Sequence, residues 1–219
     1  MSADGPPLGA HCAPLGGVGV VTGADGPPLG AHCAPSGGVG VVTGAAFMQR
    51  AHGIRLLTCD VDGVLTDGRI YVSDDGREQK AFHALDGLGL KLLMRSGVTV
   101  AWITGSNAPA VTHRARVLGV TRVTLGAEDK LATWEALRRE LALAPEACAH
   151  IGDDLPDLPV FARCGFAVAV PNAPHSVRAQ AHFVTGREGG SGAVRELCEV
   201  ILAAQGLLVP QQAALGVRP

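Results

Sequence analysis

The sequence has few aromatic residues, little net charge and no long apolar run. Aromatic residues make up 4% of the 219 residues, and the formal net charge is −2. Such a chain offers few rings for stacking on bases and no general attraction to nucleic acid or an anionic membrane. No apolar run approaches the ~18 residues of a membrane span, and the N-terminus lacks the pattern of a signal peptide. We therefore expect a cytoplasmic protein with no nucleic-acid and no membrane partner.

Paired metal-ligand spacings are also missing. The six cysteines include no CxxC pair, which argues against a zinc site. Four cysteines lie within apolar or helical patterns and are expected to be buried thiols in a reducing compartment: Cys59, Cys148, Cys164 and Cys198. The scattered histidines of the later chain are not expected to bind metal: His83, His113, His150, His175 and His182.

The first part of the chain is a tandem repeat. Residues 3–23 recur at 24–44 with one difference, Leu15 against Ser36. Two copies are too few for a solenoid, and their Gly and Pro content is typical of disorder, which we predict for residues 1–47. The near-identity of the copies also supports the hypothesis that the natural start is Met48. The His-Cys pair in each copy is weak evidence for a metal site.

From Ile54 onward, strand-like and helical patterns alternate. Strands are predicted at 54–59, 98–103, 122–125, 149–151, 167–170 and 182–184, and helices at 87–95, 108–118, 131–141, 158–163, 177–181 and 193–205. The turn sequence at 74–76, between 70–72 and 79–82, predicts a β-hairpin. The alternation predicts an α/β fold with a doubly wound, mostly parallel sheet. We assign this domain to residues 48–208 and a flexible tail to 209–219.

Polar residues follow several of the predicted strands directly. Asp60 and Asp62 follow the first, Thr104 follows the second, and Asp153 follows the fourth. Because the carboxyl ends of parallel strands meet at one edge of a sheet, these groups are expected to lie together. Carboxylates, a hydroxyl and the later Lys130 would make a magnesium and phosphoryl site.

Each of these motifs also has an ordinary structural explanation. Asp60 and Asp62 could cap a turn, Thr104 could cap a helix, and Lys130 could be a solvated surface residue. The acidic run that starts at Asp153 could serve the first turn of a helix. Their combination in this order is much more specific than any one of them.

The combination resembles the phosphatases of the haloacid dehalogenase superfamily. The shared motifs are DVDGVLT at 60–66 with the preceding strand, TGS at 104–106, Lys130, and GDDLPD at 152–157. The hairpin, FHALDGLG at 82–89, GGSGAVRE at 189–196 and AAQG at 203–206 further resemble its capless branch of 3-deoxy-D-manno-octulosonate 8-phosphate phosphatases. The similarity covers about residues 52–208. It implies a Rossmann-like sheet with a hairpin insertion and no cap domain.

The resemblance implies Mg²⁺-dependent hydrolysis of that sugar-acid phosphate, a step in lipopolysaccharide precursor synthesis. Asp60 would form an aspartyl-phosphate, and Asp62 would act as acid and then as base. Thr104 and Lys130 would hold the phosphoryl oxygens. Family members of this branch form homotetramers through the hairpin, which implies the same assembly here.

The resemblance also assigns the metal site. Asp60, Asp153 and the backbone carbonyl of Asp62 would bind magnesium, with Asp154 and Asp157 in support. No other cofactor is implied.

Substrate contacts are implied for Gly105, Ser106 and Arg195. Arg195 could bind a carboxylate or phosphate, or could lie on the helix surface. Many relatives carry Arg at the position of Ser106, and some carry Arg at the position of Leu85. Both differences concern substrate contacts rather than the core chemistry. A nine-carbon keto-sugar acid phosphate or another sugar phosphate is the alternative substrate.

Two other classes of protein gather similar residues. A signalling receiver domain has adjacent acidic residues early in the chain and no late GDDxxD, so the order here disfavours it. A catalytically inactive interaction subunit is disfavoured because Asp60 and Asp62 are both present.

Overall fold

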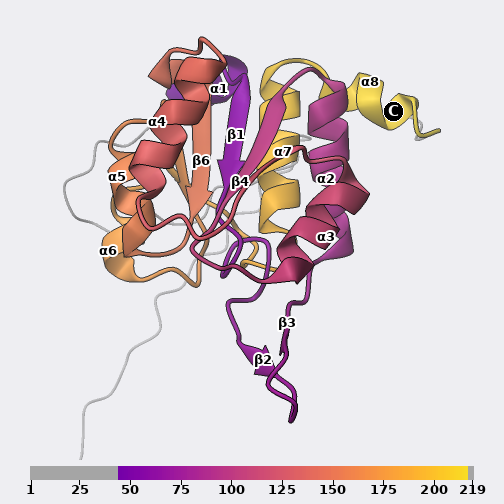
Figure 1. The fold of residues 1–219 in the computed structure, drawn as a ribbon. Coiled ribbons are helices and arrows are strands. Elements are labelled where there is room, and N and C mark those ends of the chain that lie inside the picture. The colour runs from indigo at the N-terminus through magenta and orange to yellow at the C-terminus, as the bar shows by residue number, and fades with distance from the viewer. Residues whose placement is uncertain (1–43, 217–219) are drawn as a thin grey trace, which may run out of the picture. The chain divides into compact units, whose positions relative to one another are not determined.

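The fold is built on a six-stranded sheet with the order β5-β4-β1-β6-β7-β8 (Figure 1). The structure is a computed structural model, which describes residues 44–216. Every neighbouring pair in this sheet is parallel. The strands are β1 (Leu56–Cys59), β4 (Thr99–Ile103), β5 (Arg122–Thr124), β6 (Cys148–Gly152), β7 (Phe166–Ala169) and β8 (Phe183–Val184). The predicted doubly wound sheet is confirmed.

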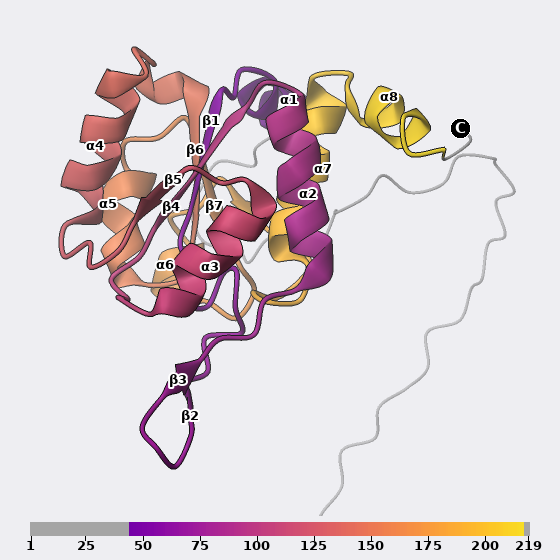
Figure 2. The same ribbon diagram turned by 45° about the vertical axis from the view of Figure 1, so that its right-hand side comes forward.

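Helices cover both faces of the sheet (Figure 2). They are α1 (Gly44–His52), α2 (Ala84–Arg95), α3 (Pro109–Leu118), α4 (Lys130–Glu140), α5 (Leu158–Phe161), α6 (His175–Arg178), α7 (Ala193–Ala204) and α8 (Leu208–Ala213), with short 3₁₀ turns at η1 (Pro145–Ala147) and η2 (Leu155–Asp157). Helices α1, α2 and α7 pack together on one face, and α4 and α5 pack together on the other. No described helix is long and apolar enough to cross a membrane.

The central strands are buried on both faces, which explains their continuous apolar sequences. All residues of β1, β6 and β7 are buried. The core between sheet and helices includes the fully buried rings of Trp102, Trp134 and Phe166. The predicted cap of α4 is also present, because the Asp129 side chain accepts a hydrogen bond from the backbone N–H of Ala132 at 2.9 Å.

Two helices were not predicted from the sequence. Helix α1 begins at Gly44, inside the segment expected to be disordered, and its Phe47 ring packs 5.0 Å from Phe183 and 5.6 Å from Phe166. Helix α8 lies, apart from its first residue, in the segment 209–219 expected to be a flexible tail, and that first residue, Leu208, packs against the core. Helix α1 packs against residues far away in the sequence, which local patterns do not reveal. The disorder predicted for residues 1–43 lies outside the described part of the chain.

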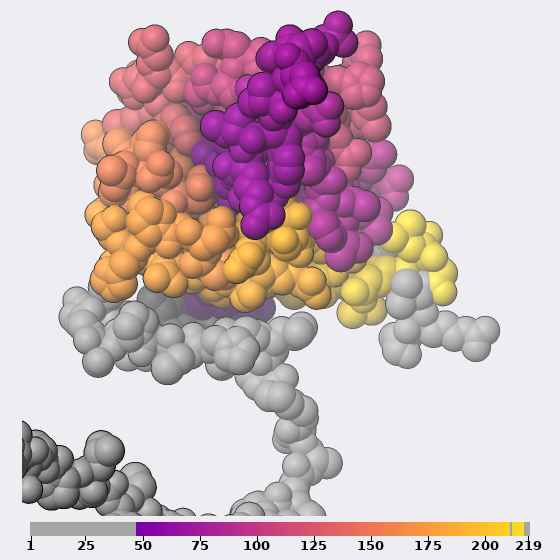
Figure 3. All heavy atoms as spheres, turned by 90° about the horizontal axis from the view of Figure 1, so that it is seen from below, coloured from indigo at the N-terminus to yellow at the C-terminus, as the bar shows by residue number. Residues whose placement is uncertain are grey.

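The predicted hairpin is present and extends from the end of the sheet where the strands terminate (Figure 1). Its atoms are purple in the space-filling view of Figure 3. Its strands are β2 (Tyr71–Val72) and β3 (Glu78–Gln79), which are antiparallel. The hairpin and its flanking loops are all that the chain inserts between β1 and α2. A cap domain is therefore absent at this point of the described chain, as predicted.

Candidate active site

Three neighbouring strands deliver the predicted site residues to one edge of the sheet. Cys59 of β1 pairs with Trp102 of β4 and with Ile151 of β6. The strand order reverses at β1, and such switch points form crevices at the carboxyl ends of the strands. A cavity of about 400 Å³ lies there, lined by Asp60, Asp62, Gly68, Thr104, Gly105, Ser106, Ala127, Glu128, Lys130, Asp153, Asp154 and Pro156.

Asp60 and Lys130 form a buried ion pair in this cavity. The Lys130 Nζ lies 2.8 Å from Asp60 Oδ2, and each side chain is less than a tenth exposed. Asp60 Oδ1 accepts a hydrogen bond from the Val61 N–H at 2.7 Å, which orients the carboxylate. Burial and the Asp157 carboxylate raise the pKa of Asp60, although Lys130 opposes this shift. The pair places a potential nucleophile beside a cation that can attract phosphoryl oxygens.

Asp157 lies beneath this pair and is fully buried. Its Oδ1 accepts hydrogen bonds from Lys130 Nζ at 2.7 Å and contacts His150 Nε2 at 2.9 Å. Its Oδ2 accepts from the backbone N–H groups of Asp153 and Asp154. Burial acts to raise the pKa of Asp157, but His150 and Lys130 outweigh it and lower the pKa to about 2. With both oxygens occupied, Asp157 fits a supporting role for the loop and the lysine.

His150 had no role in the sequence interpretation beyond the expectation that it binds no metal. The structure places it in β6, fully buried, with Nδ1 2.8 Å from the Thr58 hydroxyl and Nε2 against Asp157. The only sequence signal was a polar residue inside a buried strand.

The acidic residues of the cavity fit a divalent cation. One oxygen each from Asp60, Asp153 and Asp157 lie within 4.8 Å of one another. Asp153 Oδ1 is buried without a hydrogen-bond partner. Burial, with Asp60 and Asp157 next in effect, raises the pKa of Asp153 to about 8. Because Asp157 is occupied by other donors, Asp60 and Asp153 are the side chains that remain for Mg²⁺, which prefers such oxygens.

Gly63 allows the loop of residues 60–68 to lie close to Asp153; we call this segment the nucleophile loop, after the proposed role of Asp60. Its φ is +89°, and a Cβ atom there would lie 1.9 Å from Asp153 Oδ2. A side chain at this position would therefore be strained and would also displace the carboxylate.

Asp62 is held by two residues from different elements. Lys80, just after β3, donates from Nζ to Asp62 Oδ1. Thr104, just after β4, contacts Asp62 Oδ2 with its hydroxyl at 3.4 Å. Thr104 also accepts a hydrogen bond from the Ser106 N–H at 3.0 Å, so the turn at Gly105 is fixed beside the cavity. Lys80 was not predicted as a site residue, because a lysine at the end of a polar hairpin is typical of a solvated surface.

Arg195 is not among the residues that line the cavity. It lies in α7, and its guanidinium pairs with Glu199 at 2.8 Å. Its backbone N–H donates to Asp86 Oδ1 at 2.7 Å, which ties the start of α7 to α2. Within this chain, the structure brings the other predicted site residues together and leaves Arg195 apart.

Comparison with known proteins agrees with this geometry. A family model described as haloacid dehalogenase-like hydrolase matches residues 118–197. The chain is 49% identical over 158 residues to the 3-deoxy-D-manno-octulosonate 8-phosphate phosphatase of Yersinia pestis, covering 72% of this chain and 84% of that protein. The chain belongs to the 3-deoxy-D-manno-octulosonate 8-phosphate phosphatase family. The Escherichia coli K12 member of this phosphatase family is 45% identical over 164 residues, or 75% of this chain and 87% of the relative. The predicted superfamily is thus confirmed.

Solved structures of the same phosphatase family share the fold. The enzyme of Moraxella catarrhalis, in complex with magnesium, phosphate and a KDO molecule, has a TM-score of 0.76 and 43% identity, covering 77% of this chain and 97% of that chain. The cobalt-bound enzyme of Haemophilus influenzae has a TM-score of 0.73 and 39% identity, covering 77% of this chain and 98% of that chain.

Proposed function

We propose that this chain hydrolyses 3-deoxy-D-manno-octulosonate 8-phosphate to the free sugar acid and phosphate, with Mg²⁺ as cofactor. The observation that carries the proposal is the buried Asp60–Lys130 pair beside Asp153, in a cavity at the switch point of the sheet. The identity to phosphatases with this activity supports the same substrate. The free sugar acid is a lipopolysaccharide precursor, which places the reaction in that synthesis.

The reaction proceeds in two transfers at Asp60. In the first, a carboxylate oxygen of Asp60 forms a bond to phosphorus, the bond from phosphorus to the sugar oxygen breaks, and Asp62 gives that oxygen a proton. In the second, Asp62 takes a proton from water, the water oxygen bonds to phosphorus, and the aspartyl-phosphate bond breaks. Lys130 and the Thr104 hydroxyl hold the phosphoryl oxygens, and Gly105 and Ser106 flank them at the cavity wall.

Asp60, Asp153 and the backbone carbonyl of Asp62 would hold Mg²⁺, with Asp154 and Asp157 in support. When bound, the cation offsets negative charge on the phosphoryl group. Asp154 caps η2 with its own side chain, and Asp157 completes the same capping box. This arrangement keeps the loop that carries Asp153 rigid.

The identity of the sugar is tested by phosphate release from a panel of substrates. Ser106 stands where many relatives carry arginine, and Leu85 stands where some do, so a nine-carbon keto-sugar acid phosphate is the alternative. A preference for the eight-carbon substrate of at least about tenfold in kcat/KM, or about 1.4 kcal/mol, supports the proposal. Preference for the nine-carbon substrate, or equal rates on simple sugar phosphates, contradicts it.

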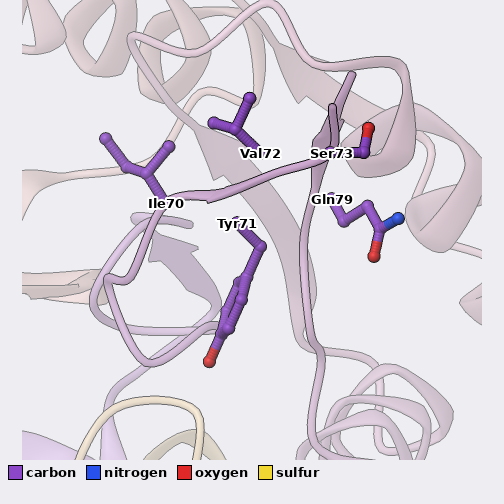
Figure 4. A pocket seen from close by; sticks show the side chains of 5 residues that line it. All are labelled: Ile70, Tyr71, Val72, Ser73 and Gln79. Carbon is purple, nitrogen blue, oxygen red and sulfur yellow. The ribbon is translucent and has the colours of Figure 1, made fainter. Parts of the chain in front are cut away.

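We also propose a homotetramer assembled through the hairpin. Ile70 is 77% exposed, Val72 is 63% exposed and Tyr71 is 41% exposed. Figure 4 shows that Ile70 and Val72 point to one side of the strand and Tyr71 to the other, around a pocket that Ser73 and Gln79 also line. Apolar side chains on a projecting hairpin favour burial against another copy. Light scattering that gives four chains per particle supports this assembly, and a monomer contradicts it.

A cytoplasmic location follows from the same proposal. The four cysteines in the described residues are free and buried, which suits a reducing compartment. Fractionation of cells that express the chain tests this location.

A further inference from the structure

Lys80 reaches from the hairpin to Asp62, the proposed acid and base. It lies just after β3, and its side chain is only 5% exposed, although the hairpin strands are exposed. Its ammonium group contacts Asp62 Oδ1, and it lies 2.7 Å from Glu78 Oε1. Lysine is rarely this buried unless it is paired. The two carboxylates therefore fix the position of this ammonium group.

Lys80 does not line the cavity, whereas Asp62 does. The Asp62 side chain is 40% exposed, and its other oxygen faces the Thr104 hydroxyl. Lys80 therefore supports Asp62 from outside the space in which a phosphate ester would lie. Contacts to both carboxylate oxygens, from Lys80 and from the Thr104 hydroxyl, restrict the orientation of the Asp62 side chain.

The hairpin is joined to the nucleophile loop at a second point. The Tyr71 hydroxyl donates to Asp67 Oδ2 at 2.6 Å. Asp67 and Asp62 lie in the same loop, which the hairpin therefore contacts twice, through Tyr71 of β2 and through Lys80 just after β3. The position of the hairpin and the orientation of Asp62 are thus coupled through direct contacts.

We propose that Lys80 is a positioning residue that holds the Asp62 carboxyl group in the orientation for proton transfer to the leaving sugar oxygen. This inference rests on the proposed function, since it assigns the proton transfer to Asp62. The hairpin then has a role inside its own subunit, in addition to any contact with another copy.

The effect of a misplaced Asp62 on the rate depends on the leaving group of the substrate. A sugar alcohol leaves as a strongly basic oxygen and needs the proton from Asp62 as its bond to phosphorus breaks. The p-nitrophenolate ion is a stable leaving group and needs no proton at that step. A misplaced Asp62 therefore slows the first substrate class much more than the second.

The test compares kcat/KM for the sugar-acid phosphate and p-nitrophenyl phosphate in the wild type and in Lys80→Met. This constant covers binding and the first transfer, so hydrolysis of the aspartyl-phosphate does not affect it. We expect a loss of about 10²-fold for the sugar-acid phosphate and of at most about threefold for the aryl phosphate. Lys80→Arg should recover most of the loss, because it restores a cation that can bind the carboxylate.

Lys91→Met is the matched control, since Lys91 lies in α2 and forms no ion pair with another described residue. Its kinetics should match the wild type. Retained aryl phosphatase activity in Lys80→Met also shows that the variant is folded; if that variant is unfolded by circular dichroism, Lys80→Gln replaces it in the same comparison.

Three results would overturn the inference. Equal losses for both substrates would assign Lys80 a general structural role. A raised inhibition constant for the free sugar acid in Lys80→Met would make Lys80 a substrate-binding residue. A wild type that releases phosphate from no monoester would instead overturn the proposed function, and the inference with it.

Discussion

The Lys130 Nζ lies between two carboxylates, 2.8 Å from Asp60 Oδ2 and 2.7 Å from Asp157 Oδ1. Burial acts to lower the pKa of Lys130, but the two carboxylates outweigh burial and raise it. One cation thus joins Asp60, the proposed nucleophile, to Asp157, which accepts hydrogen bonds from the loop that carries Asp153. Its removal leaves buried carboxylates facing one another without compensation.

Replacement of this lysine should affect stability as well as activity. Lys130→Met should lower the free energy of unfolding without Mg²⁺ by about 3 kcal/mol, because it leaves Asp60 and Asp157 buried without their partner. Urea unfolding measures this loss. Arg122→Met breaks a more exposed pair with Glu140 and should cost less than about 1 kcal/mol. Equal losses of unfolding free energy in Lys130→Met and Arg122→Met would contradict a special role for the buried Asp60–Lys130 pair.

The glycine-rich segment before α7 should be required for the shape of the nucleophile loop. Gly190 has a φ of +66°, and a Cβ there would lie 2.4 Å from the Asp67 backbone nitrogen. Its N–H donates to the Val64 carbonyl at 2.9 Å. Gly190→Ala should therefore lower both stability and phosphate release.

Gly76→Ala provides the control for that substitution. Gly76 has a similar φ of +78°, but nothing lies within 4 Å of its added Cβ. This variant should lose only about 1 to 2 kcal/mol from the positive φ. If Gly190→Ala loses no more stability than Gly76→Ala, the close contact between Gly190 and the nucleophile loop is unimportant.

Stability should depend on pH through His182. Its Nδ1 accepts a hydrogen bond from the Ala167 N–H at 2.9 Å, which requires an unprotonated nitrogen. Burial, with a smaller effect from Arg50, lowers the pKa of His182 below 6.5 in the folded state. As pH falls through 6.5, His182 therefore takes up a proton in the unfolded chain at a higher pH than in the folded chain. The free energy of unfolding decreases as a result.

Urea unfolding between pH 7 and pH 5 measures this effect. His182→Asn keeps an acceptor oxygen and should reduce the loss of stability as pH falls. The reduction should correspond to less than one proton, because the His182 ring is partly exposed and screened by solvent. Substitution of the exposed His113 by Asn should leave the decline as in the wild type. The same decline in all three proteins would rule out His182 as its source.

Magnesium should stabilise the protein more strongly at higher pH. The pKa of Asp153 is raised to about 8 by burial, Asp60 and Asp157, so protons compete with the cation below that pH. Mg²⁺ affinity should weaken by up to about tenfold per pH unit on going from pH 8 to pH 6. Thermal unfolding at several Mg²⁺ concentrations measures the affinity at each pH. Asp153→Asn should abolish the stabilisation; a pH-independent affinity would contradict competition at this carboxylate.

The sequence allowed the sheet and most cavity residues to be predicted, because strand ends in a parallel sheet meet at a fixed edge. Asp60, Thr104 and Asp153 each directly follow a strand, so one topological rule locates all three. Lys80 escaped prediction because its partner Asp62 is 18 positions away, and nothing in a short hairpin fixes the direction of a lysine side chain. Helix α1 was missed since its packing partners lie in β7 and β8, more than a hundred residues later.

The assignment of Asp60 as the group that accepts the phosphoryl is tested most directly by phosphate release with Mg²⁺. The comparison uses the sugar-acid phosphate with the wild type, Asp60→Asn and Asp74→Asn, which alters the exposed turn of the hairpin. Asp60→Asn should lose at least about 10³-fold in kcat, because the amide cannot form the covalent intermediate, while Asp74→Asn should match the wild type. Full activity in Asp60→Asn would contradict the nucleophile assignment and the mechanism built on it.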